Sequence, residues 1–408
     1  MIYMKVCIIE NIYPPYDRGG AEQVVAKTVE GLLHQGHDVI IITTMPQGNV
    51  VETDAHLTIY RRRPWNLFFY TDAQHHSVFV RFLWHAIDMV HIPMMWWVRG
   101  VLKKEQPDVV HTHNLMGLSF LIPRMIRRLG FPHIHTVHDV QLVEPSAMIL
   151  KTQEKSWRYT GWPTNMYSWL MNILMGSPDI VISPSQFLLD FYQSRGFFST
   201  SEFVVLRNPM TMDVSGEKKK KPERRPFRFL YLGQIERHKG IVFLIEVFQQ
   251  LIREKNENCE LHIVGSGSIM PEVESLVRGT PQIRIHGRMD RSQIPELFSQ
   301  TDVTVVPSLC YENSPTVIFE SLTCGVPVVA SRIEGIAELI QEGENGLTFE
   351  TEDSASLREK LLWCLEHREQ IQHMSTKAVQ SVVGLSLREY IERLVVLYGR
   401  KKSAGLRS

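Results

Sequence analysis

Two glutamates, Glu312 and Glu320, are separated by seven residues in a segment that combines turn-forming and helix-forming residues. Pro315 stands in the predicted turn, apolar residues with helical spacing follow, and Gly325 ends the predicted helix. Backbone N–H groups at the start of such a helix lack partners and attract a phosphate group. Because Glu320 lies about two helical turns beyond Glu312, the two carboxylates suit a ligand with hydroxyl groups on both sides of a phosphate, such as a nucleotide sugar.

This pattern resembles the E-x7-E motif of retaining glycosyltransferases of family 4, which have the two-domain GT-B architecture. Several spaced motifs carry the resemblance across nearly the whole chain. It implies an α/β fold with two Rossmann-like doubly wound domains that face each other across a cleft. The simpler alternative is that Glu312 and Glu320 are two solvated carboxylates on a helix, but the proline, glycine and strand pattern around them favours the family motif.

The resemblance assigns the donor diphosphate to residues 233–240. In the family motif an arginine follows a glycine and a lysine precedes another glycine. Lys239 matches that lysine, whereas Gln234 occupies the place of the arginine. A glutamine can donate a neutral hydrogen bond but carries no charge, so part of the expected clamp is missing. Arg237 or His238 could replace the missing cation, and Lys239 could instead be an ordinary surface lysine.

Further donor contacts are implied by the same resemblance. Glu320 accepts hydrogen bonds from the ribose hydroxyls, and Glu312 faces the hydroxyls of the donor sugar. Backbone groups near Gly265 read the base, which leaves uridine, guanosine and adenosine open, with uridine favoured on family frequency alone. The loop facing the distal phosphate consists of Asn313, Ser314, Pro315, Thr316 and Val317.

Gly19 and Gly20 form a second predicted phosphate-binding element. Without side chains, their backbone can approach a diphosphate closely, and the helix that follows adds its dipole. A pair of glycines also occurs in plain turns. The position of this pair after the first predicted strand, however, resembles the family loop.

His138 lies at the end of a predicted strand, at the edge of the sheet where ligands bind in open α/β folds. The resemblance implies that it contacts the donor sugar near the reacting carbon. It is not expected to act as the base, because in retaining GT-B enzymes the departing phosphate oxygen is thought to fill that role. His111 and His113 also end a strand, where a core role and an acceptor-side role are equally open. We expect no metal site, because no carboxylate partners these histidines at metal-ligand spacing.

The elements that position these residues follow a repeated alternation of strand and helix. The chain has 408 residues, which indicates two domains. We expect an N-terminal acceptor domain at 1–207, a C-terminal donor domain at 208–385, and a last helix at 386–400 that packs back on the first domain. The predicted strands are short, apolar and followed by polar loops, as in a buried parallel sheet. They lie at 5–10, 38–43, 107–113, 133–138, 179–183, 227–233, 260–264, 283–286, 302–306 and 327–330.

Composition excludes several other classes of protein. Lysine plus arginine equals aspartate plus glutamate, so no overall positive field favours nucleic acid. The five cysteines lack metal-site spacing, and the N-terminus reads as a strand and not a signal peptide. Since no run of eighteen apolar residues occurs, we expect no membrane span and a cytoplasmic protein. The lysine run at 218–221 is interpreted as a solvated loop, although a contact with a membrane or nucleic acid is the alternative.

An aromatic segment at 65–101 lies in the half of the chain that holds the acceptor in this architecture. One interpretation is that its helices pack on the sheet. The other is an exposed surface that meets a lipid-linked acceptor, with peripheral contact to the inner face of a membrane. Trp157, Trp162 and Trp169 raise the same question.

The sequence therefore predicts a retaining, metal-independent glycosyltransferase without a cofactor. It would move a hexosyl unit from a nucleoside diphosphate sugar, marginally a UDP-sugar, to a glycan or lipid-linked hydroxyl. Two alternatives remain: a sugar-nucleotide 2-epimerase or hydrolase on the same fold, and a non-catalytic scaffold that binds a nucleotide sugar.

Overall fold

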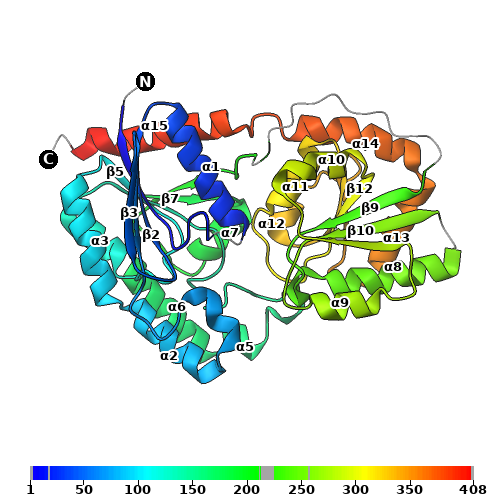
Figure 1. Cartoon of the computed structure of the whole chain (residues 1–408), viewed down its shortest axis with the longest axis horizontal. Helices are drawn as coiled ribbons and strands as arrows, with labels where there is room; N and C mark the ends of the chain where they lie inside the picture. Colours follow the sequence, from blue (N-terminus) through cyan, green and yellow to red (C-terminus); the bar gives the residue numbers. More distant parts are fainter. Residues whose placement is uncertain (1–2, 17–18, 211, 213–224, 256–257, 406–408) are drawn as a thin grey trace. The chain divides into compact units, whose positions relative to one another are not determined.

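The chain is seen in a computed structural model, which describes residues 3–16, 19–210, 212, 225–255 and 258–405 (Figure 1). The lysine run expected to form a solvated loop lies outside the described residues.

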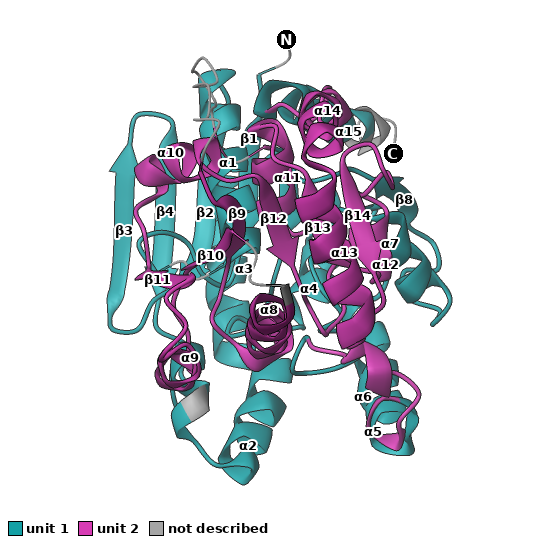
Figure 2. Cartoon of the chain, turned by 90° about the vertical axis from the view of Figure 1, so that its right-hand side faces the viewer, with its two compact units in different colours: residues 1–147, 160–209, 387–408 teal, residues 148–159, 210–386 magenta. Residues whose placement is uncertain are grey.

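Internal contacts divide the chain into two compact units (Figure 2). The first comprises Met1–Ala147, Thr160–Pro209 and Leu387–Ser408, and the second comprises Met148–Tyr159 and Met210–Ser386.

This division differs from the expected boundary after residue 207 in one respect, because Met148–Tyr159 groups with the second unit. Leu150 forms a β-bridge with Cys310, and the backbone N–H of Lys151 donates to the carbonyl of Leu309 at 2.9 Å. The side chain of Lys151 also pairs with Glu334. These backbone and charge contacts hold the segment against loops of the second unit. Because the contacting residues are far apart in the sequence, the local sequence does not reveal this grouping.

The first unit is built on an eight-stranded sheet in the order β3-β4-β2-β1-β5-β6-β7-β8. Only the edge pair β3–β4 is antiparallel among the described strands, and the strands from β4 to β8 pair in parallel. Nearly every residue of β1 and β2 is buried, as expected for a parallel sheet covered on both faces. The strands are β1 (Lys5–Ile9), β2 (Asp38–Thr44), β3 (Asn49–Asp54), β4 (Leu57–Arg62), β5 (Val109–Thr112), β6 (His133–Thr136), β7 (Ile180–Ser183) and β8 (Glu202–Val205).

Helices cover this sheet and connect its parallel strands. They are α1 (Gly20–His34), η1 (Tyr70–His75), α2 (Val78–Met89), α3 (Ile92–Glu105), α4 (Ile122–Leu129), α6 (Trp162–Met175), α7 (Gln186–Gln193) and α15 (Leu387–Gly405). The short α5 (Trp157–Thr160) begins at the end of the segment that groups with the second unit.

The second unit has a six-stranded sheet in the order β11-β10-β9-β12-β13-β14, with every described pair parallel. Its strands are β9 (Phe227–Leu232), β10 (Cys259–Val264), β11 (Ile283–Gly287), β12 (Val303–Val306), β13 (Val328–Ser331) and β14 (Gly346–Phe349). Its helices are η2 (Lys151–Gln153), η3 (Arg237–Lys239), α8 (Ile241–Lys255), α9 (Met270–Leu276), η4 (Arg291–Gln293), α10 (Ile294–Ser299), α11 (Thr316–Thr323), α12 (Glu334–Ala337), α13 (Ser354–Glu366) and α14 (Arg368–Ser381).

The last helix, α15, packs against α1 in the core of the first unit. Gly31 of α1 permits this close approach, because a Cβ atom there would lie 2.5 Å from Cγ1 of Ile391. Ile391, Leu394 and Tyr398 of α15 are fully buried.

The carboxyl ends of the central strands bring the predicted functional residues together within each unit. In the first unit β5 lies between β1 and β6, so the residues that follow these strands meet at one edge of the sheet. In the second unit β9 lies between β10 and β12, with the same consequence for their loops.

Replacing Ile391 with alanine should lower the free energy of unfolding of the first unit by about 2–4 kcal/mol, because it leaves a cavity under α15. Chemical denaturation followed by circular dichroism measures the change. The exposed Val396 on the same helix serves as the control, and its replacement by alanine should change stability by less than about 0.5 kcal/mol. Equal effects at the two positions would contradict the packing described for α15.

Candidate active site

Lys239 and Glu312 form an ion pair at the carboxyl edge of the second sheet. Lys239 ends the short η3 after β9, and Glu312 lies in the loop between β12 and α11. The hydroxyl of Ser308 donates to the same Glu312 oxygen, Oε1, at 3.0 Å. Burial by itself would lower the pKa of Lys239, but the Glu312 carboxylate outweighs it and raises the pKa above its usual value. The ammonium group therefore stays charged at neutral pH.

Close packing of two loops brings this pair together. Gly240 follows Lys239 with a φ of +74°, and a Cβ atom there would lie 1.8 Å from the carbonyl oxygen of Pro307. The backbone N–H of Leu309 donates to the carbonyl of His238 at 2.9 Å. Only glycine fits this contact, which explains the glycine after the lysine.

The segment before α11 is fixed in a similar way. Asn313, Ser314 and Pro315 precede the helix, and Thr316 and Val317 are its first two residues. A Cβ atom at Gly335 would lie 2.0 Å from the carbonyl oxygen of Glu312 and 2.7 Å from Cα of Asn313. The start of α11, whose N–H groups are suited to an anion, is therefore held against α12.

Glu320 is buried in the second turn of α11 and pairs with Arg291 of η4, with 2.6 Å between Nη2 and Oε1. The arginine keeps a negative charge acceptable at this depth. Such a carboxylate can still accept hydrogen bonds from hydroxyl groups through its remaining lone pairs.

The other predicted donor residues of this unit surround the pair without forming part of it. Gln234 is exposed, and its backbone carbonyl accepts a hydrogen bond from the Tyr231 hydroxyl at 2.6 Å. Arg237 pairs with Glu272 of α9 at 2.7 Å, so its described charge contact points away from Glu312. At Gly265, a Cβ atom would lie 1.8 Å from the carbonyl oxygen of Gly233, which indicates a structural need for glycine.

In the first unit, Gly20 begins α1 and Gly19 caps it in an extended conformation. The loop that leads to them is anchored by the buried Arg61, whose guanidinium donates to the carbonyl oxygens of Tyr13 at 3.2 Å and Pro14 at 2.6 Å. A charged donor that satisfies two carbonyls fixes the backbone at Tyr13 and Pro14.

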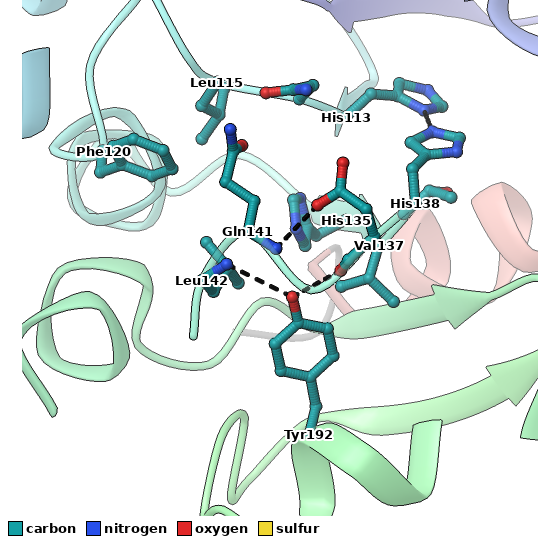
Figure 3. Close-up of a pocket in the computed structure, with 12 residues that line it drawn as sticks. His113, Leu115, Phe120, His135, Val137, His138, Gln141, Leu142 and Tyr192 are labelled. Carbon is teal, nitrogen blue, oxygen red and sulfur yellow. Dashed lines mark hydrogen bonds between the residues drawn. The ribbon is translucent and has the colours of Figure 1, made fainter. Parts of the chain in front are cut away.

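His138 belongs to a cluster at the ends of β1, β5 and β6. Its Nε2 atom lies 2.9 Å from Nδ1 of His113, and Figure 3 shows the two rings stacked at the side of a pocket. Glu10 accepts a hydrogen bond from the backbone N–H of Asn114 at 3.1 Å. One ligating atom each of Glu10, His113 and His138 lies within 4.8 Å of the others. The hydrogen bond between the two rings joins His113 to His138, and the bond from Asn114 holds Glu10 beside them.

Behind this cluster, hydrogen bonds connect His111 of β5 to β6 and to the last helix. His111 makes contacts of 2.7 Å with the hydroxyl of Tyr398 through Nδ1 and with that of Thr136 through Nε2. His111 is fully buried, so it has a core role and does not line the pocket.

Burial controls the protonation of this network. It lowers the pKa of His138 to about 4 and that of His135 to about 3, and it lowers the pKa values of His111 and His113 well below their usual range. Burial also raises the pKa of Asp139, which lines the pocket, to about 6. His138 is therefore neutral at neutral pH and offers a hydrogen bond, not a charge.

The two halves of the chain each match a family model. Residues 18–213 match Glycosyltransferase Family 4, and residues 226–367 match Glycosyl transferases group 1. An uncharacterized 42.6 kDa protein in the cps region of Klebsiella pneumoniae is 22% identical over 340 residues, which cover 82% of this chain and 87% of the relative.

Solved structures share the fold over the full length. Sucrose-phosphate synthase from Thermosynechococcus elongatus has a TM-score of 0.74 at 18% identity, covering 98% of this chain and 99% of the other. Anabaena HepE in complex with UDP-glucose has a TM-score of 0.67 at 15% identity, covering 98% and 100%. The chain is a GT-B glycosyltransferase. Its architecture of two α/β domains is the predicted one.

Three contacts of this glycosyltransferase were missed by the sequence reasoning. Arg291 pairs with Glu320, Ser308 binds Glu312, and Glu10 approaches His138. Glu10 directly follows the apolar strand β1, and that position at a strand end was a usable signal. Arg291 and Ser308 follow no recognisable motif.

Acidification from pH 7 to pH 5 should destabilise the first domain. Its buried histidines are neutral when folded, so between their folded pKa values and about 6.5 the unfolded chain binds more protons, and stability rises with pH. Glu10, Asp88 and Asp139, whose pKa values are raised by burial, act in the opposite sense and lose their contribution as pH rises. The histidines outnumber these three carboxyl groups, and each contributes up to about 1.4 kcal/mol per pH unit. They are His111, His113, His133, His135 and His138.

Urea unfolding at a series of pH values measures this dependence. A His133→Asn variant should show a shallower slope of unfolding free energy against pH, whereas the exposed His373→Asn control should keep the slope of the wild type. A stability that does not change between pH 7 and pH 5 would contradict the prediction.

Proposed function

We propose that this glycosyltransferase is a retaining, metal-independent enzyme that transfers a hexosyl unit from a nucleoside diphosphate sugar. The acceptor is a hydroxyl group of a glycan or of a lipid-linked saccharide, and the location is the cytoplasm. The observation that carries the proposal is the ion pair between Lys239 and Glu312 at the carboxyl edge of the second sheet.

The pair presents two complementary groups to a sugar diphosphate. Breaking the bond between sugar and diphosphate leaves negative charge on the departing phosphate, and stabilising this charge is the largest expected catalytic contribution. The Lys239 ammonium supplies a permanent positive charge, and the N–H groups at the start of α11 add fixed dipoles. Glu312 then accepts hydrogen bonds from the sugar hydroxyls, and Glu320 accepts them from the ribose.

Gln234 shapes the proposed mechanism because it brings no charge to the diphosphate. Arg237 is engaged with Glu272 in the described structure, so Lys239 carries a larger share of charge stabilisation than in enzymes with an arginine at this place. In the first domain Gly19 and Gly20 would approach the diphosphate through the backbone. His138, neutral at pH 7, would donate a hydrogen bond to the donor sugar, and the leaving phosphate oxygen would take the acceptor proton.

A UDP-sugar is the proposed donor, with support from the UDP-glucose complex of Anabaena HepE, which shares the fold. A second candidate function, a non-catalytic protein that binds a nucleotide sugar, is favoured by one observation: Gln234 in place of the arginine. Such a protein would bind the donor but never release nucleoside diphosphate.

Replacing either Lys239 or Glu320 with alanine should remove about 2–4 kcal/mol of transition-state stabilisation. This loss appears as a fall in kcat/KM. The rate at which nucleoside diphosphate is released from the donor sugar measures the loss. Glu366→Gln, an exposed carboxylate on α13, is the matched control and should keep wild-type turnover. The site assignment would be wrong if both alanine variants kept that turnover as well.

UDP should raise the melting temperature of the protein more than GDP or ADP at equal concentration. A ligand that binds the folded state stabilises it by about 2.7 kcal/mol at a hundred times its Kd.

Proton NMR of the product tests retention, because an α-linked donor should give an α-linked product. An inverted anomeric configuration would exclude the retaining mechanism.

A further inference from the structure

Two helices of the first domain expose apolar stripes to solvent. On α2 the side chains of Phe79 and Phe82 are 69% and 67% exposed, with Leu83 and Ile87 continuing the stripe at helical spacing. Large exposed apolar patches on a protein surface mark interaction sites.

The second stripe runs along α6. Trp162, Met166, Trp169 and Ile173 recur every three or four residues, and all four side chains are exposed. In Figures 1 and 2, α2 and α6 lie at the same end of the first domain. The apolar faces of both helices therefore point outward, where an ordinary surface helix carries polar residues.

Hydrogen bonds fix the chain segment that precedes α2. Nε1 of Trp84 in α2 donates to the carbonyl of Phe68 at 2.8 Å, and Asn66 donates to the carbonyl of Trp84 at 3.2 Å. The carbonyl of Trp65, whose side chain is largely exposed, contacts the ring of His91 at 2.9 Å at the start of α3. The segment before α2 is thus fixed to both α2 and α3.

Charge on this side of the domain is strongly positive, although the whole chain has 44 basic and 44 acidic residues. α3 packs against α4, and α4 packs against α6. The two acidic residues on α2, α3, α4 and α6 are both engaged. Asp88 is buried and accepts from the N–H of Gly117 at 2.8 Å, and Glu105 pairs with Lys5 at 2.8 Å. The same four helices carry seven basic residues, of which Lys104 also pairs with Glu105 at 3.6 Å and Arg127 donates to the carbonyl of Met175 at 2.7 Å. The seven are Arg81, Arg99, Lys103, Lys104, Arg124, Arg127 and Arg128.

We propose that the face formed by α2, α3, α4 and α6, here called the docking face, binds the surface of a bilayer that contains anionic lipids. Its aromatic and apolar side chains would insert at the level of the headgroups, and its arginines would contact lipid phosphates. A groove between α3 and α4 combines both properties. It is lined by apolar residues, among them Ile92, Trp96 and Met125, and by Arg99, Arg124 and Arg128.

The docking face lies on the membrane and does not cross it. Val78–Glu105 has the length and composition of a membrane-spanning helix, with only 22% of its most apolar window buried. The segment is, however, divided into α2 and α3 at Val90 and His91. Met94, Val98 and Leu102 of α3 are buried in the domain, so that half of the segment is already packed against protein.

Charge favours a membrane over a second copy of this chain as the occupant. Two identical docking faces would bring like charges together, which opposes self-association. An anionic bilayer offers an apolar interior and a negative surface, and it complements both features at once.

Flotation of the full-length protein with vesicles tests the proposal without donor or acceptor, so its outcome is independent of the proposed reaction. The protein should float with vesicles of equal parts phosphatidylglycerol and phosphatidylcholine, and binding should weaken in high salt. The double variant Phe79→Ser/Phe82→Ser should bind at least about tenfold more weakly. Replacing Arg99, Arg124 or Arg128 singly with glutamine should weaken binding to the vesicles about fivefold.

Two control variants with equally exposed residues in other places should bind like the wild type: Val383→Ser in the second domain and Arg388→Gln at the start of α15. Thermal melting of every variant checks that it is folded. A wild-type protein that stays with the unbound fraction would overturn the proposal. A dimer in analytical ultracentrifugation that dissociates in the Phe79→Ser/Phe82→Ser variant, without vesicle binding, would overturn it too and identify a second copy as the occupant.

Discussion

The half-buried ion pair between Lys239 and Glu312 is the interaction on which the proposed site of the second domain depends. An ammonium or carboxylate withdrawn from water alone is destabilising, whereas the pair is tolerated because each charge satisfies the other. Its geometry rests on the backbone: Gly240 lies against the carbonyl of Pro307, and Leu309 is hydrogen-bonded to His238. A side chain at Gly240 would separate the two loops and with them the two charges. The contact between Gly240 and Pro307 therefore stabilises the two loops and also keeps Lys239 next to Glu312.

The first domain presents the opposite kind of polar centre. Its histidines are buried, hydrogen-bonded to one another and to hydroxyl groups, and kept neutral by burial. A neutral network provides direction without charge, which suits the positioning of sugar hydroxyls. An ion pair with an excess of nearby N–H dipoles suits a diphosphate. The second domain thus presents a charged pair and the first a neutral network, which agrees with the proposed roles of Lys239 and His138.

The parts of the fold that were predictable from sequence are those that burial determines locally. β1 and β2 are largely apolar because both faces of the sheet are covered, and β12 and β13 of the second sheet follow the same rule. β3 escaped prediction because every residue of Asn49–Asp54 is exposed at the sheet edge, so no apolar pattern marks it. Lys239 and Glu312, which the motif predicts as site residues, lie together as an ion pair in the structure. The contacts of Arg291 and the grouping of Met148–Tyr159 depend on tertiary proximity, which no local pattern encodes.

Composition also does not distinguish core from exposed surface in the aromatic segment at 65–101, because its helices have apolar residues on both faces. Trp84 and Met94 turn inward to the core, while Phe79, Phe82 and Trp96 turn outward. A helix that is apolar all round is normally buried on every side, and here the outer side lacks a protein neighbour among the described residues. The positive charge of the adjoining α3 and α4 distinguishes this surface from a merely incomplete core. A surface that is both apolar and basic in an otherwise neutral chain has the two properties that an anionic membrane complements.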